Sequence, residues 1–271
     1  MDEDANIEAV VTAVKQSRKY RDTSEETIRE LAEIAWRQHR KLKPAVKAVR
    51  ARLHSIMAPY LGDPDYETAV SQLEAAFATG DDSQIRAVCR DIMFHHLSTR
   101  ERLPLLERFY REIFAVTGLP RSILDIACGL NPLAFPWMGL TPPVDFYAYD
   151  IHEPRVNFLN TYFRLQGLPP LARVQDVALR VPAETADVAL FLKEMPRFER
   201  NYHGRGRPLL EALRVRWLVI SFPTVSTHGG RNLTNRYRQF MHELIADKPW
   251  PVTELLFEGE LVFCVEKRIE A

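Results

Sequence analysis

The spacing of apolar residues divides the chain near residue 120 into two differently built parts. Up to about residue 117 apolar side chains recur every three or four positions, as at Ile28, Leu31 and Ala35, and this period predicts amphipathic helices. Residues 98–101 have the form of a capping box and predict the start of one long helix that ends at Gly118. The first part of the chain is therefore predicted to be helical almost throughout.

Beyond Arg121, short runs rich in β-branched and aromatic residues alternate with segments of helix length. The expected strands are residues 122–127, 145–149, 172–175, 187–192, 217–222, 252–257 and 261–266. This alternation predicts an α/β fold, a parallel sheet with helices on both faces. Only residues 258–260 separate the last two runs, which is hairpin length, so we expect the sheet to end in an antiparallel pair.

Composition limits the class of protein. The chain has 271 residues, of which 46% are hydrophobic, and no apolar run approaches the roughly 18 residues of a membrane span. Because residues 1–10 are acidic where a signal peptide would be basic and then apolar, we expect a cytoplasmic protein with no membrane association. The three cysteines lie far apart and match no metal spacing, so we expect reduced thiols and no metal site. Without an exposed heptad seam we expect a monomer.

Basic residues gather in three separate stretches although the net charge is zero. The stretches are residues 37–52, 197–216 and 231–238. Such clusters in a neutral chain favour a local phosphate-binding face over a surface that coats nucleic acid everywhere. The candidate RNA-binding residues are Arg37, Lys43, Lys47, Arg50, Arg52, Arg205, Arg231 and Arg236.

Three predicted strands end in residues suited to binding a nucleoside. The first ends in a turn that contains Gly129, the second in Asp150 and the third in Asp176. Carboxyl ends of parallel strands share one edge, where an acidic residue about 20 positions after the glycine turn meets ribose hydroxyls. The chain has neither a GxGxxG motif after a strand nor a GxxxxGK[ST] loop, so a cofactor without phosphates fits better. S-adenosyl-L-methionine is such a cofactor, and by analogy of fold the pattern indicates a Rossmann-like class I methyltransferase.

Several longer motifs are more specific than any single glycine. They are "STRERLP" (98–104), "ACGLNPLA" (127–134), "YDIH" (149–152), "FLKEMPRFER" (191–200) and "SFPT" (221–224) with "GGR" (229–231). In these motifs the chain resembles the aminoglycoside-resistance 16S rRNA methyltransferases, which modify N7 of a guanine in the ribosomal decoding site. The resemblance implies an all-helical N-terminal domain (1–105) that docks on the 30S subunit and a methyltransferase domain (106–271).

The resemblance also implies roles for individual residues. The implied cofactor-binding residues are Arg100, Ala127, Gly129, Asp150, Ile151, Asp176, Val177 and Leu192. Among them Arg100 would hold the methionine carboxylate, Asp150 the ribose, and Asp176 with Val177 the adenine. Lys193 and Glu199 would border the target base.

The sequence leaves alternatives open. Guanine N7 carries a lone pair and no proton at neutral pH, so its methylation needs placement and no general base. Methylation of a pyrimidine at C5 would instead need a cysteine nucleophile, and Cys128 is the candidate, although it is expected to be packed. Residues 225–234 depart from the family pattern, which leaves open an RNA methyltransferase with a shifted rRNA target. A non-catalytic RNA-binding assembly factor with the same fold is the other alternative.

Overall fold

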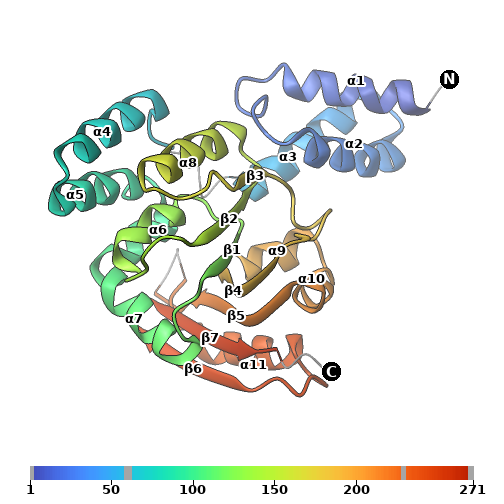
Figure 1. Cartoon of the computed structure of the whole chain (residues 1–271). Helices are drawn as coiled ribbons and strands as arrows, with labels where there is room; N and C mark the ends of the chain where they lie inside the picture. Colours follow the sequence, from blue (N-terminus) through green and yellow to red (C-terminus); the bar gives the residue numbers. More distant parts are fainter. Residues whose placement is uncertain (1–2, 58–62, 227–229, 268–271) are drawn as a thin grey trace.

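A computed structural model describes residues 3–57, 63–226 and 230–267 (Figure 1). The helices that precede the sheet are α1 (Glu3–Lys15), α2 (Glu25–His39), α3 (Leu42–Met57), α4 (Tyr66–Thr79), α5 (Asp82–Met93), α6 (Leu97–Arg102), the 3-10 helix η2 (Leu103–Leu105) and α7 (Leu106–Thr117). The predicted helical first part is therefore confirmed. None of the described helices has the length and apolar character that a bilayer crossing requires.

The second part of the chain forms a seven-stranded sheet in the order β3-β2-β1-β4-β5-β7-β6. Its strands are β1 (Ser122–Ile126), β2 (Asp145–Asp150), β3 (Ala172–Val174), β4 (Thr185–Leu192), β5 (Arg214–Pro223), β6 (Val252–Phe257) and β7 (Glu260–Glu266). The first five strands pair in parallel, and β7 runs antiparallel to both β5 and β6. All seven predicted strands, the α/β class and the terminal antiparallel pair are confirmed.

Helices cover both faces of this sheet (Figure 1). The covering elements within the second part are η3 (Asn131–Trp137), α8 (Glu153–Leu165), α9 (Met195–Asn201), α10 (Gly206–Ala212) and α11 (Thr234–Leu244). Successive strand residues point to opposite faces, so Ile123 joins the core beneath α7 and α8 while Leu124 joins the core beneath α9, α10 and α11. Two buried faces explain why the strands read as nearly continuous apolar runs.

Helices α1–α3, here called the N-terminal lobe, have a hydrophobic core of their own around Val10, Ile28 and Leu53. By contrast, the apolar residues of α4, α5 and α7 belong to the core on the α7–α8 face of the sheet. The lobe is joined to the sheet through polar contacts such as Ser24 N–H to the Ile151 carbonyl, at 2.7 Å. The division of the chain after residue 105 stays a prediction.

The expected long helix from residue 98 is wrong. Helix α6 begins at Leu97, and the chain passes through a 3-10 turn at Pro104 before α7 starts. Proline lacks an N–H and its ring clashes with the preceding turn, so the helix is interrupted there. The Thr99 hydroxyl donates to the Met93 carbonyl at 2.5 Å and no side chain caps α6. The interruption leaves Arg102 almost completely buried, 2% exposed.

Candidate active site

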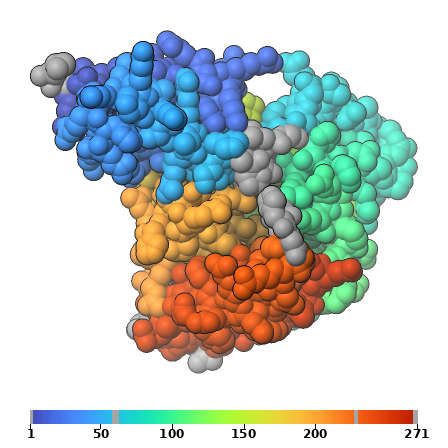
Figure 2. Space-filling model, turned by 180° about the vertical axis from the view of Figure 1, so that it is seen from behind, coloured from blue at the N-terminus to red at the C-terminus, as the bar shows by residue number. Residues whose placement is uncertain are grey.

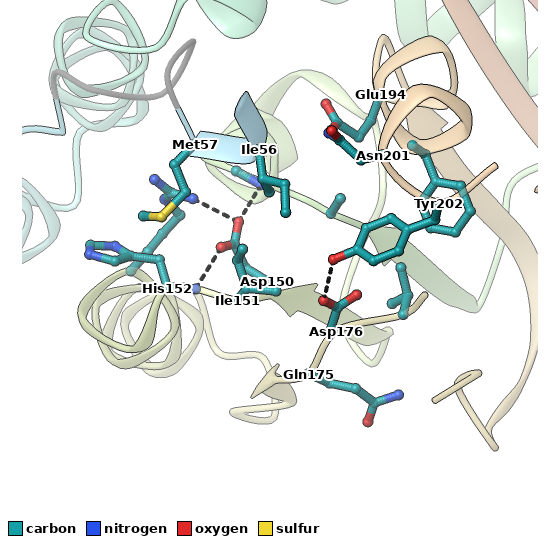
Figure 3. A pocket seen from close by; sticks show the side chains of 15 residues that line it. Ile56, Met57, Asp150, Ile151, His152, Gln175, Asp176, Glu194, Asn201 and Tyr202 are labelled. Carbon is teal, nitrogen blue, oxygen red and sulfur yellow. Dashed lines mark hydrogen bonds and ion pairs between the residues drawn. The ribbon is translucent and has the colours of Figure 1, made fainter. Parts of the chain in front are cut away.

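A pocket lies where the carboxyl ends of β1, β2, β3 and β4 meet the end of α3 (Figure 3). We call it the strand-end pocket; it is lined by Ile56, Met57, Ala127, Gly129, Asp150, Ile151, His152, Arg155, Gln175, Asp176, Val177, Glu194, Phe198, Asn201 and Tyr202. Six of the eight predicted cofactor-binding residues are among them. The structure thus brings together the glycine turn, the β2 acid and the acid after β3.

The turn after β1 has a backbone that few residues adopt. Both Ala127 and Gly129 have positive φ angles, of 51° and 55°. A Cβ atom at Gly129 would also lie 3.1 Å from Nδ1 of the buried His96. The Gly129 N–H donates to Oδ2 of Asp150 at 3.1 Å, which fixes the turn to the end of β2. Both conformation and space therefore favour glycine at this position.

The Asp150 carboxylate is held from several directions. Its Oδ1 accepts from the His152 N–H at 2.9 Å, and its Oδ2 accepts from Nη1 of Arg155 at 2.8 Å (Figure 3). Arg155 in turn donates from Nη2 to Asp63, which precedes α4, at 2.8 Å. Burial by itself would raise the pKa of Asp63, but the His96 hydrogen bond and the Arg155 charge lower it well below its ordinary value. The carboxylate at the end of β2 is therefore preorganised by a buried ionic cluster.

The Asp176 carboxyl group is nearly buried and links distant parts of the chain. Its Oδ2 accepts from the Tyr202 hydroxyl at 2.8 Å and from the Thr27 hydroxyl of α2 at 3.0 Å, and its Oδ1 accepts from the Ala178 N–H at 2.9 Å. Burial raises the pKa of Asp176, and these three hydrogen bonds oppose that increase. The acid after β3 is thereby tied to the N-terminal lobe.

Lys193 and Glu199 lie outside the lining of the strand-end pocket and have different surroundings. The Lys193 side chain is 8% exposed, and its Nζ lies 2.7 Å from Oε2 of Glu101 and 3.3 Å from Oε2 of Glu260. The Glu199 carboxylate accepts from the N–H groups of Gly204 and Gly206, at 2.9 and 2.5 Å, and so fixes the start of α10. Roles of these residues beside a target base stay predictions.

Arg100 and Leu192 are the two predicted cofactor-binding residues that do not line the pocket. Arg100 is exposed, with its guanidinium carbon 5.3 Å from the centre of the Phe94 ring. Leu192 is half-buried and packs against the core beneath α7 and α8.

The eight candidate RNA-binding residues, here called the basic set, lie mostly at the surface. Arg52 is half-buried and the other seven are exposed. Some have protein partners: Arg37 pairs with Glu33 at 3.2 Å, and Arg205 pairs with Glu30 at 3.3 Å. Arg52 and Arg205 also line a groove between the N-terminal lobe and the segment around residue 201, where the lobe stands against the rest of the molecule (Figure 2).

The divergent segment 225–234 is described only in part, because residues 227–229 lie outside the described ranges. Its two ends pair through an antiparallel bridge between Val225 and Asn232, and the Ser226 N–H donates to the Arg231 carbonyl at 3.0 Å.

Sequence reasoning missed four residues in or near the strand-end pocket. Arg155 lines the pocket, and its place on the first turn of the helix after Asp150 was the signal available. The Asn131 side chain accepts from Arg102 and Tyr110 and donates to Asp125, partners that the motif around it does not indicate. The position of Ile56 and Met57 against the pocket had no local signal in the sequence.

The strand order with its final antiparallel strand and the pocket at the strand ends define a Rossmann-like methyltransferase fold of the S-adenosylmethionine-dependent class. Residues 16–264 match the profile of the family described as "Ribosomal RNA methyltransferase (FmrO)", and the chain belongs to this family. The resemblance stated from the motifs is confirmed.

Relatives and solved structures agree with this assignment. A Micromonospora echinospora protein named 16S rRNA (guanine(1405)-N(7))-methyltransferase is 34% identical over 265 residues, covering 96% of this chain and 97% of its own. A Frankia casuarinae protein of the same name is 36% identical, covering 96% and 94%. The crystal structure of the 16S rRNA methyltransferase RmtF in complex with S-adenosyl-L-homocysteine has a TM-score of 0.79 and 32% identity, covering 99% of this chain and 100% of its own.

Proposed function

We propose that this protein transfers the methyl group of S-adenosyl-L-methionine to N7 of a guanine in the 16S rRNA decoding site of the 30S subunit. The modification would confer resistance to aminoglycosides that bind there. The observation that carries the proposal is the strand-end pocket, in which the glycine turn, Asp150 and Asp176 converge in a chain of the rRNA methyltransferase family. Relatives matched over nearly their whole length are named for the same reaction.

The residues present in the pocket fit this cofactor. The Asp150 carboxylate, fixed by Arg155 and the His152 N–H, suits the two hydroxyls of a ribose. Asp176 offers an acceptor for the adenine amino group, and Ile56, Met57 and Phe198 supply apolar surface for a flat ring. No phosphate needs to be bound, in agreement with the single glycine in the turn. When bound, the cofactor supplies an electrophilic methyl group on a sulfonium sulfur.

The protein's own residues need only hold, orient and shield the reacting groups. Guanine N7 provides an electron pair without losing a proton, so no general base is required. Cys128 is buried beside the turn, and burial raises the pKa of its thiol well above the ordinary value. A thiol in that state is a poor nucleophile, which disfavours C5 methylation of a pyrimidine. We assign Lys193 to the orientation of the base and Glu199 to the support of the adjoining loop.

The basic set supplies contacts to the rRNA backbone, and we expect docking on the 30S subunit to depend on salt. We place the reaction in the cytoplasm, where assembled subunits are found, and take a single chain as the active unit because one chain lines the whole pocket.

A shifted rRNA target is the second candidate, favoured by the divergent residues 225–234. Both candidates are tested by incubating intact 30S subunits with radiolabelled S-adenosyl-L-methionine and mapping the product by reverse-transcription stops after borohydride and aniline treatment. Label at the decoding-site guanine supports the leading proposal, and label at another rRNA position supports the second. No label in 30S subunits, together with no calorimetric binding of the cofactor, would reject both in favour of an assembly factor.

Resistance profiling is the matching test in cells. Expression in a susceptible bacterium should raise the inhibitory concentrations of gentamicin and kanamycin more than that of apramycin, because modifications at different decoding-site positions protect against different drugs. The Asp150→Asn variant, which should lose cofactor affinity, serves as the control for an effect of expression alone.

A further inference from the structure

A network of buried polar side chains lies beside the strand-end pocket. Lys193 is its only member with a role in the proposed reaction. At its centre, Arg102 of α6 donates from Nη2 to Oε1 and from Nε to Oε2 of Glu260, at 2.7 and 3.1 Å. Both side chains are almost fully buried, with 1% and 2% exposed. A two-pronged guanidinium–carboxylate pair holds its members in one orientation. Glu260, the first residue of β7, is therefore fixed in place by the helical segment.

The same carboxylate reaches Lys193 by two routes. Directly, Glu260 Oε2 lies 3.3 Å from the Lys193 ammonium nitrogen. Indirectly, the Ser221 hydroxyl donates to Glu260 Oε1 at 2.6 Å and accepts from the Lys193 N–H at 3.0 Å. The second route matters because Lys193 has a φ of 59°, a conformation that side-chain-bearing residues rarely adopt and that surrounding contacts must maintain.

Glu101 also contacts the Lys193 ammonium, at 2.7 Å, but its side chain is 45% exposed. Ion pairs with a solvated partner contribute little and exchange readily, whereas a carboxylate as buried as Glu260 stays in place. An ammonium has three N–H donors, so Lys193 can contact both Glu101 and Glu260 and still donate to another acceptor. Glu101 is thus a replaceable partner of Lys193 and Glu260 a permanent one.

The chemistry of the target says what this ammonium is for. Guanine presents two acceptors on one edge, N7 and O6. During methylation the N7 electron pair is engaged with the methyl group, which leaves O6 as the atom to which an ammonium can donate. A donor held at O6 fixes the in-plane rotation of the base and hence the direction of the N7 electron pair.

We propose that Glu260, held by Arg102, is a positioning residue that aims Lys193 at O6 of the target guanine. This inference rests on the proposed function, since it names how one side chain serves that reaction. Glu260 touches neither cofactor nor base in this assignment and acts through Lys193.

The first test is steady-state kinetics of the Glu260→Gln variant on 30S subunits. The amide keeps the shape of the side chain but loses the charge that draws the ammonium. We expect kcat to fall about tenfold or more, the range for a misplaced positioning group. The KM for 30S subunits and the Kd for S-adenosyl-L-homocysteine should stay unchanged. In a Lys193→Met background the same substitution should have no further effect. An unchanged kcat, or an equal loss in both backgrounds, would overturn the inference.

The matched control is Glu266→Gln at the other end of β7, where the carboxylate pairs with the exposed Arg216 at 3.0 Å. It should leave kcat unchanged. If Glu260→Gln does not fold, Glu260→Asp decides by the same criteria, because it keeps a charge beside Arg102 but shortens the side chain that reaches the Lys193 ammonium. A fall in kcat that depends on Lys193 supports the inference, and an unchanged kcat overturns it.

A second readout needs no methyl transfer, so it separates failure of this inference from failure of the proposed function. Reductive methylation of lysines with formaldehyde, followed by peptide mass spectrometry, reports how tightly each ammonium is held. Lys193 should react slowly in the wild-type protein and faster in Glu260→Gln, with Lys248 as internal reference. Equal Lys193 rates in the two proteins would contradict the inference even where the wild type methylates 30S subunits.

Discussion

The strand-end pocket and the basic set differ in how the protein holds their side chains. In the pocket, Asp150 and Asp176 are buried and each carboxylate accepts three hydrogen bonds from protein donors. In the basic set, seven of the eight side chains are exposed. The pocket carboxylates are therefore held in place by the protein itself, whereas the exposed basic side chains are free to change conformation.

This difference determines how much each contact contributes and how strongly it depends on salt. Pairs such as Arg37 with Glu33 contribute about 0–1 kcal/mol each, so exchanging the acid for a phosphate is easy and depends on salt. A buried carboxylate that loses a donor has no water to replace it, so small changes there have large effects. Several hydrogen bonds join the N-terminal lobe to the pocket, among them those from the Thr27 hydroxyl to Asp176 and from the Ser24 N–H to the Ile151 carbonyl.

The largest effect is expected from Asp150→Asn in the pocket. The change removes the charge that Arg155 and the ribose hydroxyls face, which should weaken cofactor binding by on the order of 1.5–3 kcal/mol, about 10- to 150-fold in Kd. Calorimetry with S-adenosyl-L-homocysteine measures it. Asp145→Asn, at the exposed start of the same strand, should bind as the wild type does. Equal affinities for all three proteins would show that the pocket is wrongly placed.

Next comes Lys47→Glu on the exposed side of α3. We expect binding to 30S subunits to weaken about tenfold, and the slope of log K against log salt to drop by about one, because one phosphate contact is lost. Cofactor affinity should not change. The control is Arg111→Glu on α7, at the far end of the molecule from α1–α3 (Figure 1). If Arg111→Glu weakens 30S binding as much as Lys47→Glu does, net charge governs docking and the exposed side of α3 does not.

A smaller effect is expected from Thr27→Val, which removes one of the hydrogen bonds between the N-terminal lobe and the pocket. Loss of the hydroxyl that donates to Asp176 should weaken cofactor binding by about 0.5–1.5 kcal/mol, a few-fold in Kd. The exposed Thr12→Val in α1 provides the comparison and should have no effect on cofactor binding. If Thr27→Val also leaves the Kd unchanged, the hydrogen bond from Thr27 to Asp176 does not contribute to cofactor binding.

The last prediction concerns stability and pH, not ligand binding. Burial raises the pKa of Asp125 to about 8 from an ordinary value of 3.8, against the Asn131 hydrogen bond. At pH values between 3.8 and about 8, Asp125 keeps its proton in the folded protein and loses it in the unfolded chain. The free energy of unfolding therefore falls as the pH rises through this range. Asparagine does not titrate. The melting temperature of Asp125→Asn should therefore rise relative to that of the wild type between pH 5 and pH 8. The variant Asp247→Asn, at an exposed position, should show no such trend.

Much of the fold was predictable because its signals are local. Apolar periodicity located all seven strands, and a three-residue connection predicted the antiparallel end of the sheet. The positions of Gly129, Asp150 and Asp176 at strand ends predicted that they would converge, since parallel strands share one carboxyl edge. The prediction was wrong for the helix around Pro104. The capping pattern at residues 98–101 predicts an uninterrupted helix, and Pro104 interrupts it.

The sequence by itself thus determined the class of fold, the edge of the sheet at which the pocket lies and the family. Only the tertiary structure decided which distant polar groups meet. Arg102 and Glu260 stand 158 residues apart, and Thr27 and Asp176 149 apart, yet each pair is buried in one contact. No local pattern encodes such partners: a buried polar group must find a donor or acceptor, and chain folding in three dimensions alone determines which one lies within reach.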